Sequence, residues 1–105
     1  GKWDSDKSEE DINTEFYLRQ GSEYQRFREK GKSRGNNFSA VAVCVQHCSH
    51  SGMGYAKNQK KANKMALKSC KKVNKKNYGN IDCIITLEGD NPVYYKNIHE
   101  YKKGN

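Results

Sequence analysis

Two stretches of the chain carry the apolar pattern of buried β-strands. From Phe38 to Val45 the residues are apolar at odd and even positions alike and rich in β-branched side chains, which predicts a strand buried on both faces. Residues 81–87 alternate instead, and this predicts a second strand with one apolar face. That face comprises Ile81, Cys83, Ile85 and Leu87.

Between these strands, the apolar positions recur at the spacing of an α-helix. Asn58 is expected to cap this helix, and the segment Asn77–Asn80 is expected to end it. The predicted buried stripe consists of Ala62, Ala66, Ser69 or Cys70, and Val73. Lysines project from the opposite side of the same helix, namely Lys60, Lys64, Lys68 and Lys71.

The remaining segments give weaker patterns. A first helix is expected from Ser8, with Gly21 as its natural end. Residues 24–28 fit either an edge strand or a continuation of that helix, and residues 31–37 have the composition of a loop. Further along, Gly54–Ala56 begins a possible pairing strand, and residues 93–101 fit a last strand or a short helix.

The order α-(β)-β-β-α-β predicts an α+β fold with a small antiparallel sheet packed against helices. With 105 residues, the chain has room for one domain, expected over residues 8–105 after a flexible N-terminus at residues 1–7. The longest apolar run, Ala40–Val45, is too short to cross a bilayer, so membrane insertion is not expected.

Charge is distributed unevenly around a formal net charge of +8. Residues 30–79 contain Arg34 and eleven lysines but no aspartate or glutamate, whereas the two flanking segments are slightly acidic. Such a stretch repels itself unless an anionic partner binds it or the fold disperses it over several faces. We therefore expect RNA or another polyanion as a partner, although a purely solubilising lysine surface would give the same composition.

Several motifs resemble, in their order, those of the double-stranded RNA-binding domain. The likeness covers residues 12–73, lacks the family's Pro-His loop and leaves about thirty C-terminal residues unexplained. The matching segments are Glu15–Leu18, Tyr24, Gly31–Arg34, Phe38–Val43, Gly52–Gly54 and Lys60–Ala66.

By this resemblance, the helix around Glu15 would enter one minor groove of duplex RNA, and the loop with Lys32 and Arg34 the next. Lysines at the start of the later helix would lie across the intervening phosphates. These are Lys57, Lys60, Lys61, Lys64 and Lys68.

A second resemblance covers residues 38–87 and concerns an exported bacterial domain family of unknown function. Its motifs here are Ala40–Ala42, Gly54–Ala56, Ala66-Leu67 with Cys70, and Asp82–Ile85. That family implies a disulfide between Cys70 and Cys83. The residue pattern agrees, because Cys70 borders the apolar stripe of its helix and Cys83 lies on the inward face of its strand. This resemblance implies no activity.

The segment Cys44–His50 also contains His47 and Cys48, and thiolates with imidazoles are the usual ligands of zinc. The spacing is not that of a standard zinc finger, so a Cys44–Cys48 bridge or two free thiols is favoured and no cofactor is expected. His47, His50 and His99 could alternatively supply the acid and base of a small basic ribonuclease toxin.

Together these patterns predict a non-catalytic domain that binds an anionic partner, with structured, double-stranded RNA as the leading choice. The alternative is an exported, disulfide-stabilised domain that binds a protein or an envelope polymer, and the ribonuclease comes third. Reduced cysteines would fit a cytoplasmic RNA-binding protein, whereas a Cys70–Cys83 bridge would fit a periplasmic or secreted one.

Overall fold

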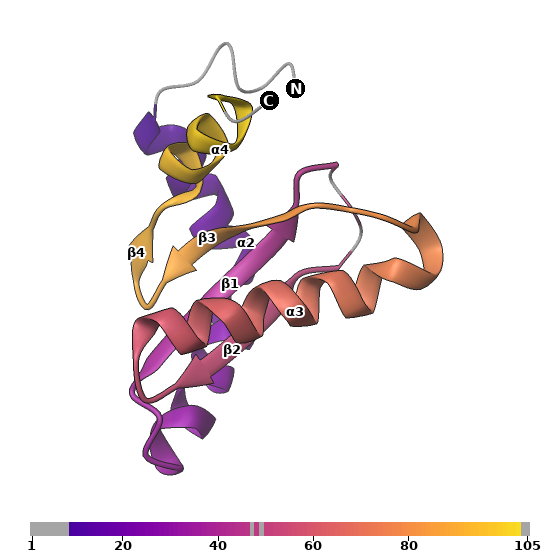
Figure 1. The fold of residues 1–105 in the computed structure, drawn as a ribbon. Helices are drawn as coiled ribbons and strands as arrows, with labels where there is room; N and C mark the ends of the chain where they lie inside the picture. Colours follow the sequence, from indigo (N-terminus) through magenta and orange to yellow (C-terminus); the bar gives the residue numbers. More distant parts are fainter. Residues whose placement is uncertain (1–8, 47, 49, 104–105) are drawn as a thin grey trace.

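The computed structural model describes residues 9–46, 48 and 50–103, with side chains from residue 21 onward (Figure 1). The observed order of elements confirms the predicted α+β class. The elements are α2 (Glu9–Ser33), β1 (Phe38–Cys44), β2 (Gly52–Ala56), α3 (Gln59–Tyr78), β3 (Cys83–Glu88), β4 (Asn91–Pro92) and α4 (Tyr94–Lys103). The predicted flexible segment 1–7 and the expected helix start at Ser8 lie outside the described residues.

The four strands form one antiparallel sheet in the order β2-β1-β3-β4. Strand β1 is central, and helices cover both of its faces: α3 lies across one face, while α2 and α4 lie together on the other (Figure 1). This arrangement explains why β1 is apolar at odd and even positions, since Ala40, Val41 and Ala42 are all completely buried.

Small residues let α3 approach the sheet closely. Ala62, Ala66 and Cys70 face the sheet and are completely buried. Opposite them, a Cβ atom at Gly52 would lie 2.2 Å from the backbone nitrogen of Cys70, and one at Gly54 would lie 2.4 Å from the carbonyl oxygen of Ala62. Both glycines are therefore required by the distance between β2 and α3, rather than by backbone conformation.

The predicted stripe of α3 is confirmed at Ala62, Ala66 and Cys70 and wrong at Val73. Val73 is 43% exposed, and the next residue, Asn74, is buried in its place. The buried positions follow each other at intervals of four residues, so the stripe continues from Cys70 to Asn74. The predicted N-cap is confirmed, because the Asn58 side chain accepts a hydrogen bond from the Lys61 backbone N–H at 2.8 Å.

On the opposite face of the sheet, the second half of α2 is anchored by Tyr24. Its ring is buried beside Val41 and Leu87, and its hydroxyl donates to the carbonyl oxygen of Gly89 at 2.8 Å. Arg28, one turn later, forms an ion pair with Asp90. Of the two alternatives for residues 24–28, the structure therefore has the helix, stabilised by contacts with the turn that follows β3.

A β-bulge corrects the predicted apolar face of residues 81–87. Ala42 pairs with Ile85, but the preceding Val41 pairs with Leu87, so one strand contains an extra residue, Thr86. As a result, Ile85 faces α3 while Leu87 contacts Tyr24 on the other side. The single apolar face predicted from alternation is wrong at Leu87 because the bulge reverses the side to which the strand's later residues point.

The expected end of the first helix at Gly21 is confirmed, because the backbone of Gly21 is not helical (φ 39°, ψ −134°) and divides α2 into two helical segments. The second segment continues through residues 31–33, which were expected to be loop. Of the two alternatives for residues 93–101, the structure has the short helix, α4, whose Ile98 and Tyr94 pack against Ile84.

Replacing Gly52 by alanine should lower the free energy of unfolding by about 3 kcal/mol, because the new methyl group meets the α3 backbone, which cannot move aside cheaply. Urea denaturation measures this loss. The matched control is Gly35→Ala: nothing lies within 4 Å of the position that its new methyl group would take, but its φ is 81°. That variant should lose only about 1 kcal/mol from backbone strain. Equal losses in the two variants would contradict the close contact.

Candidate polyanion-binding face and adjoining groove

The outward side of α3 is strongly basic, and we call its exposed lysines the lysine face. The buried stripe fixes its direction, since side chains opposite Ala62, Ala66 and Cys70 must point to solvent. All eight lysines of the helix are exposed. They are Lys60, Lys61, Lys64, Lys68, Lys71, Lys72, Lys75 and Lys76.

Within the described part of the chain, no carboxylate forms an ion pair with a lysine of this face. The first turn of α3 contains no acidic residue, although an acid there would stabilise the positive end of the helix dipole. From Lys60 to Lys75 the face extends about 22 Å along the helix axis. It is therefore a long, uncompensated row of positive charge, a form suited to a chain of phosphates or other anions.

The other residues predicted to bind RNA lie outside α3, on α2 or in the segments that follow α2 and β2. Lys57 is exposed immediately before the N-cap of α3 and extends the row by one residue. Lys32 is exposed in the last turn of α2, and Arg34 follows the helix and donates to the Tyr55 hydroxyl at 3.3 Å. Glu15 lies in the first part of α2, and its side chain is outside the described residues.

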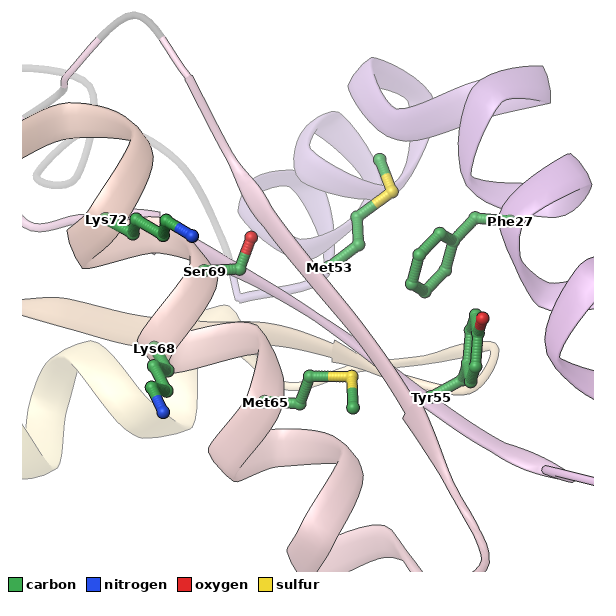
Figure 2. A pocket seen from close by; sticks show the side chains of 7 residues that line it. All are labelled: Phe27, Met53, Tyr55, Met65, Lys68, Ser69 and Lys72. Carbon is green, nitrogen blue, oxygen red and sulfur yellow. The ribbon is translucent and has the colours of Figure 1, made fainter.

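Next to the lysine face is a groove with a volume of about 380 Å³, between α2 and α3 (Figure 2). Figure 2 shows side chains from three elements converging on it, with Phe27 projecting from α2 toward Tyr55 and Met65 projecting from α3 toward β2. The lining residues are Phe27, Met53, Tyr55, Met65, Lys68, Ser69 and Lys72. The groove is thus mainly apolar, with two lysines among its lining residues on the α3 side.

Gly31 shapes the α2 side of this groove. A Cβ atom at Gly31 would lie 2.7 Å from the Tyr55 ring, so glycine allows this ring to lie against the helix. The Tyr55 ring in turn contacts Phe27, with 4.8 Å between the ring centroids. Sequence reasoning missed the groove because its residues come from three separate elements. A local signal was present in Met65, an apolar residue outside the predicted buried stripe of α3, which the structure leaves 46% exposed.

The structure contains two disulfides, Cys44–Cys48 and Cys70–Cys83. The second is the pairing implied by the exported-domain resemblance. Both lie beneath the lysine face, since the Sγ atoms of Cys44 and Cys70 are 4.0 Å apart in the core between α3 and the sheet. Zinc binds cysteine as thiolate, so the bridged sulfurs of Cys44 and Cys48 do not act as zinc ligands in this state.

The described histidines lie on different elements and are both exposed. His50 precedes β2, and its backbone carbonyl accepts a hydrogen bond from the buried Asn74 side chain at 2.9 Å. His99 lies on α4 against Tyr95, with ring centroids 4.4 Å apart. His47 is outside the described residues. The structure thus gives His50 a structural role through its backbone, and Asn74 is the anchor that sequence reasoning did not identify.

Comparison of the chain with protein-family models, curated proteins and solved structures finds no match. The two resemblances drawn from its motifs therefore remain hypotheses about this chain. Among the helices within residues 9–103 that the structure describes, none is long and apolar enough to cross a membrane.

The two disulfides should contribute unequally to stability. Cys83→Ser opens a bridge with a sequence separation of 13 and should cost about 3 kcal/mol, whereas Cys48→Ser opens one with a separation of 4 and should cost about 2 kcal/mol. Denaturant unfolding without reductant measures both losses. A Cys83→Ser variant with the midpoint of the wild-type protein would show that the Cys70–Cys83 bridge does not stabilise the fold.

Proposed function

We propose that this domain is a non-catalytic binder of a polyanion, namely structured, double-stranded RNA, and that the lysine face of α3 makes the principal contact. The observation that carries the proposal is the row of eight exposed lysines on one helix with no carboxylate paired to any of them among the described residues. Eight like charges on one helix repel each other, and bound phosphates would relieve that repulsion.

A lysine side chain acts as a mobile point charge, so this face is suited to phosphates and not to reading base sequence. A helix surface about 22 Å long matches recognition of duplex RNA by shape and backbone. The motif resemblance adds contacts by Glu15 in the first part of α2, by Lys32 in its last turn and by Arg34 just after it. These residues would set the orientation of the duplex, while the α3 lysines would supply most of the affinity.

The two disulfides favour a second candidate. Disulfides persist in oxidising compartments, so they are compatible with an exported protein. In that location the lysine face would bind an anionic envelope polymer or an acidic protein. Both candidates use the same electrostatic surface, and they differ in whether the polyanion must have the geometry of an A-form duplex.

Fluorescence anisotropy with a labelled RNA duplex of about 20 bp tests the first candidate, with duplex DNA and single-stranded RNA in parallel. Affinity for duplex RNA should exceed that for the other two polymers and should fall steeply between two salt concentrations, because bound phosphates release counterions. Equal, weak binding to all three would contradict an RNA function and favour the second candidate. A gel of the RNA after incubation detects cleavage, which the ribonuclease alternative requires.

Reversal of two charges at the start of α3 should weaken duplex RNA binding at least tenfold while the fold is retained. The variant is Lys60→Glu with Lys61→Glu, and loss of two phosphate contacts should also reduce the salt slope by about 2. The charge-matched control is Lys96→Glu with Lys103→Glu, two exposed positions on α4. If both double variants bound RNA equally, the contact could not be assigned to α3.

A further inference from the structure

Strand β2 forms one edge of the sheet and pairs only with β1. In an antiparallel edge strand, alternate residues direct their backbone N–H and C=O groups away from the neighbouring strand. For Gly52–Ala56, no backbone hydrogen bond joins these groups to any other described segment. The outer edge of β2 therefore offers a row of donors and acceptors without a protein partner in the described part of the chain.

The groove described above lies along this edge. Figure 2 shows β2 running between its two walls, with Phe27 on the α2 side and Met65 on the α3 side. Met53 and Tyr55 are alternate residues of β2 and contribute their side chains to the α2 side. An added strand would thus meet an apolar, aromatic wall on one of its faces.

The α3 wall has a different character. Besides Met65, it contains Ser69, Lys68 and Lys72, and none of the lining residues is acidic. Arg34, on the α2 side, adds a positive charge at the Tyr55 hydroxyl. Because side chains of a strand alternate between two faces, the two walls together select a sequence in which apolar and acidic residues alternate.

We propose that β2 is the docking site for an extended, acidic segment of a partner protein, which adds to the sheet as a fifth strand. Main-chain hydrogen bonds to the outer edge of β2 supply affinity. Alternate apolar side chains contact Phe27, Met53 and Tyr55, and acidic side chains on the other face approach Lys68 and Lys72.

The same features argue against other occupants of the groove. A lipid chain would leave the backbone groups of β2 without partners, and RNA does not present a ladder of peptide donors and acceptors. A second copy of this chain would bring Lys68 and Lys72 toward their own counterparts on a molecule of net charge +8. Edge-to-edge pairing of two copies is therefore opposed by like-charge repulsion.

This docking site adjoins the proposed RNA contact, and the two share Lys68 and Lys72 of the lysine face. Its other α3 residues, Met65 and Ser69, do not belong to the lysine face. Since β2 has five residues, about seven peptide residues suffice to cover it with one residue beyond each end.

The probe is a labelled seven-residue peptide of alternating glutamate and valine with blocked ends, and fluorescence anisotropy measures its affinity. Two derivatives carry N-methyl groups on the odd or the even peptide nitrogens. In a bound strand, one set of N–H groups faces β2 and the other faces solvent. One derivative should therefore bind at least tenfold more weakly than the other. Equal affinities for the two derivatives, or no binding of the parent peptide, would overturn strand addition.

The groove is tested with two variants that make the same change on the same helix. Met65 and Val73 are 46% and 43% exposed, and only Met65 lines the groove. Met65→Glu should weaken peptide binding at least tenfold, because it places a carboxylate among the acidic side chains of the peptide. Val73→Glu should leave it within twofold. Equal effects of the two variants would overturn the placement of the peptide in the groove.

Two further readouts identify a different occupant. Amide hydrogen exchange at Met53, Tyr55 and their neighbours in β2 should slow when the peptide binds, and an unchanged rate would contradict strand addition.

Sedimentation of the protein alone should give a monomer. A dimer that Met65→Glu dissociates would show that a second copy fills the groove. Duplex RNA binding by the Met65→Glu and Val73→Glu variants should be equal, so this proposal can fail while the RNA proposal stands.

Discussion

The close approach of α3 to the sheet is the contact on which the rest of the structure depends. It is possible only because Gly52 and Gly54 face Ala62, Ala66 and Cys70, with no side chain larger than a thiol between the two backbones. A small-residue contact of this kind buries little apolar area per residue. The Cys70–Cys83 bridge adds a covalent link between α3 and β3 at the same interface.

This contact also determines where charge can lie. Once the alanine stripe is buried, the lysines of α3 are left on its exposed sides, and the helix presents a strongly basic surface. The same placement of α3 over β2, together with α2 behind it, leaves the outer edge of β2 at the bottom of a groove. The two proposed binding surfaces therefore adjoin, and a single helix supplies residues to both.

The sequence predicts a large part of this arrangement. Asn58, the alanine stripe and the lysines of α3 follow from local rules, since capping, helical periodicity and exposure of charge act within a few residues. The predicted α+β order is correct for the same reason. Prediction fails at Leu87, which a bulge turns to the other face. It leaves residues 24–28 open between a strand and a helix, because the contacts of Tyr24 and Arg28 that stabilise the helix are made with the turn after β3.

By itself the sequence determines which face of α3 is basic. Helical spacing of the alanines defines the buried side, and the absence of carboxylates from residues 30–79 leaves lysine as the only charged residue on the exposed side. It does not determine the groove. Phe27, Tyr55 and Met65 are far apart along the chain and belong to three elements, and each alone has the pattern of an ordinary surface or core residue. Packing brings these three residues together beside the unpaired edge of β2. The strand order places β2 outermost, and that order depends on contacts between distant segments, which no local pattern determines.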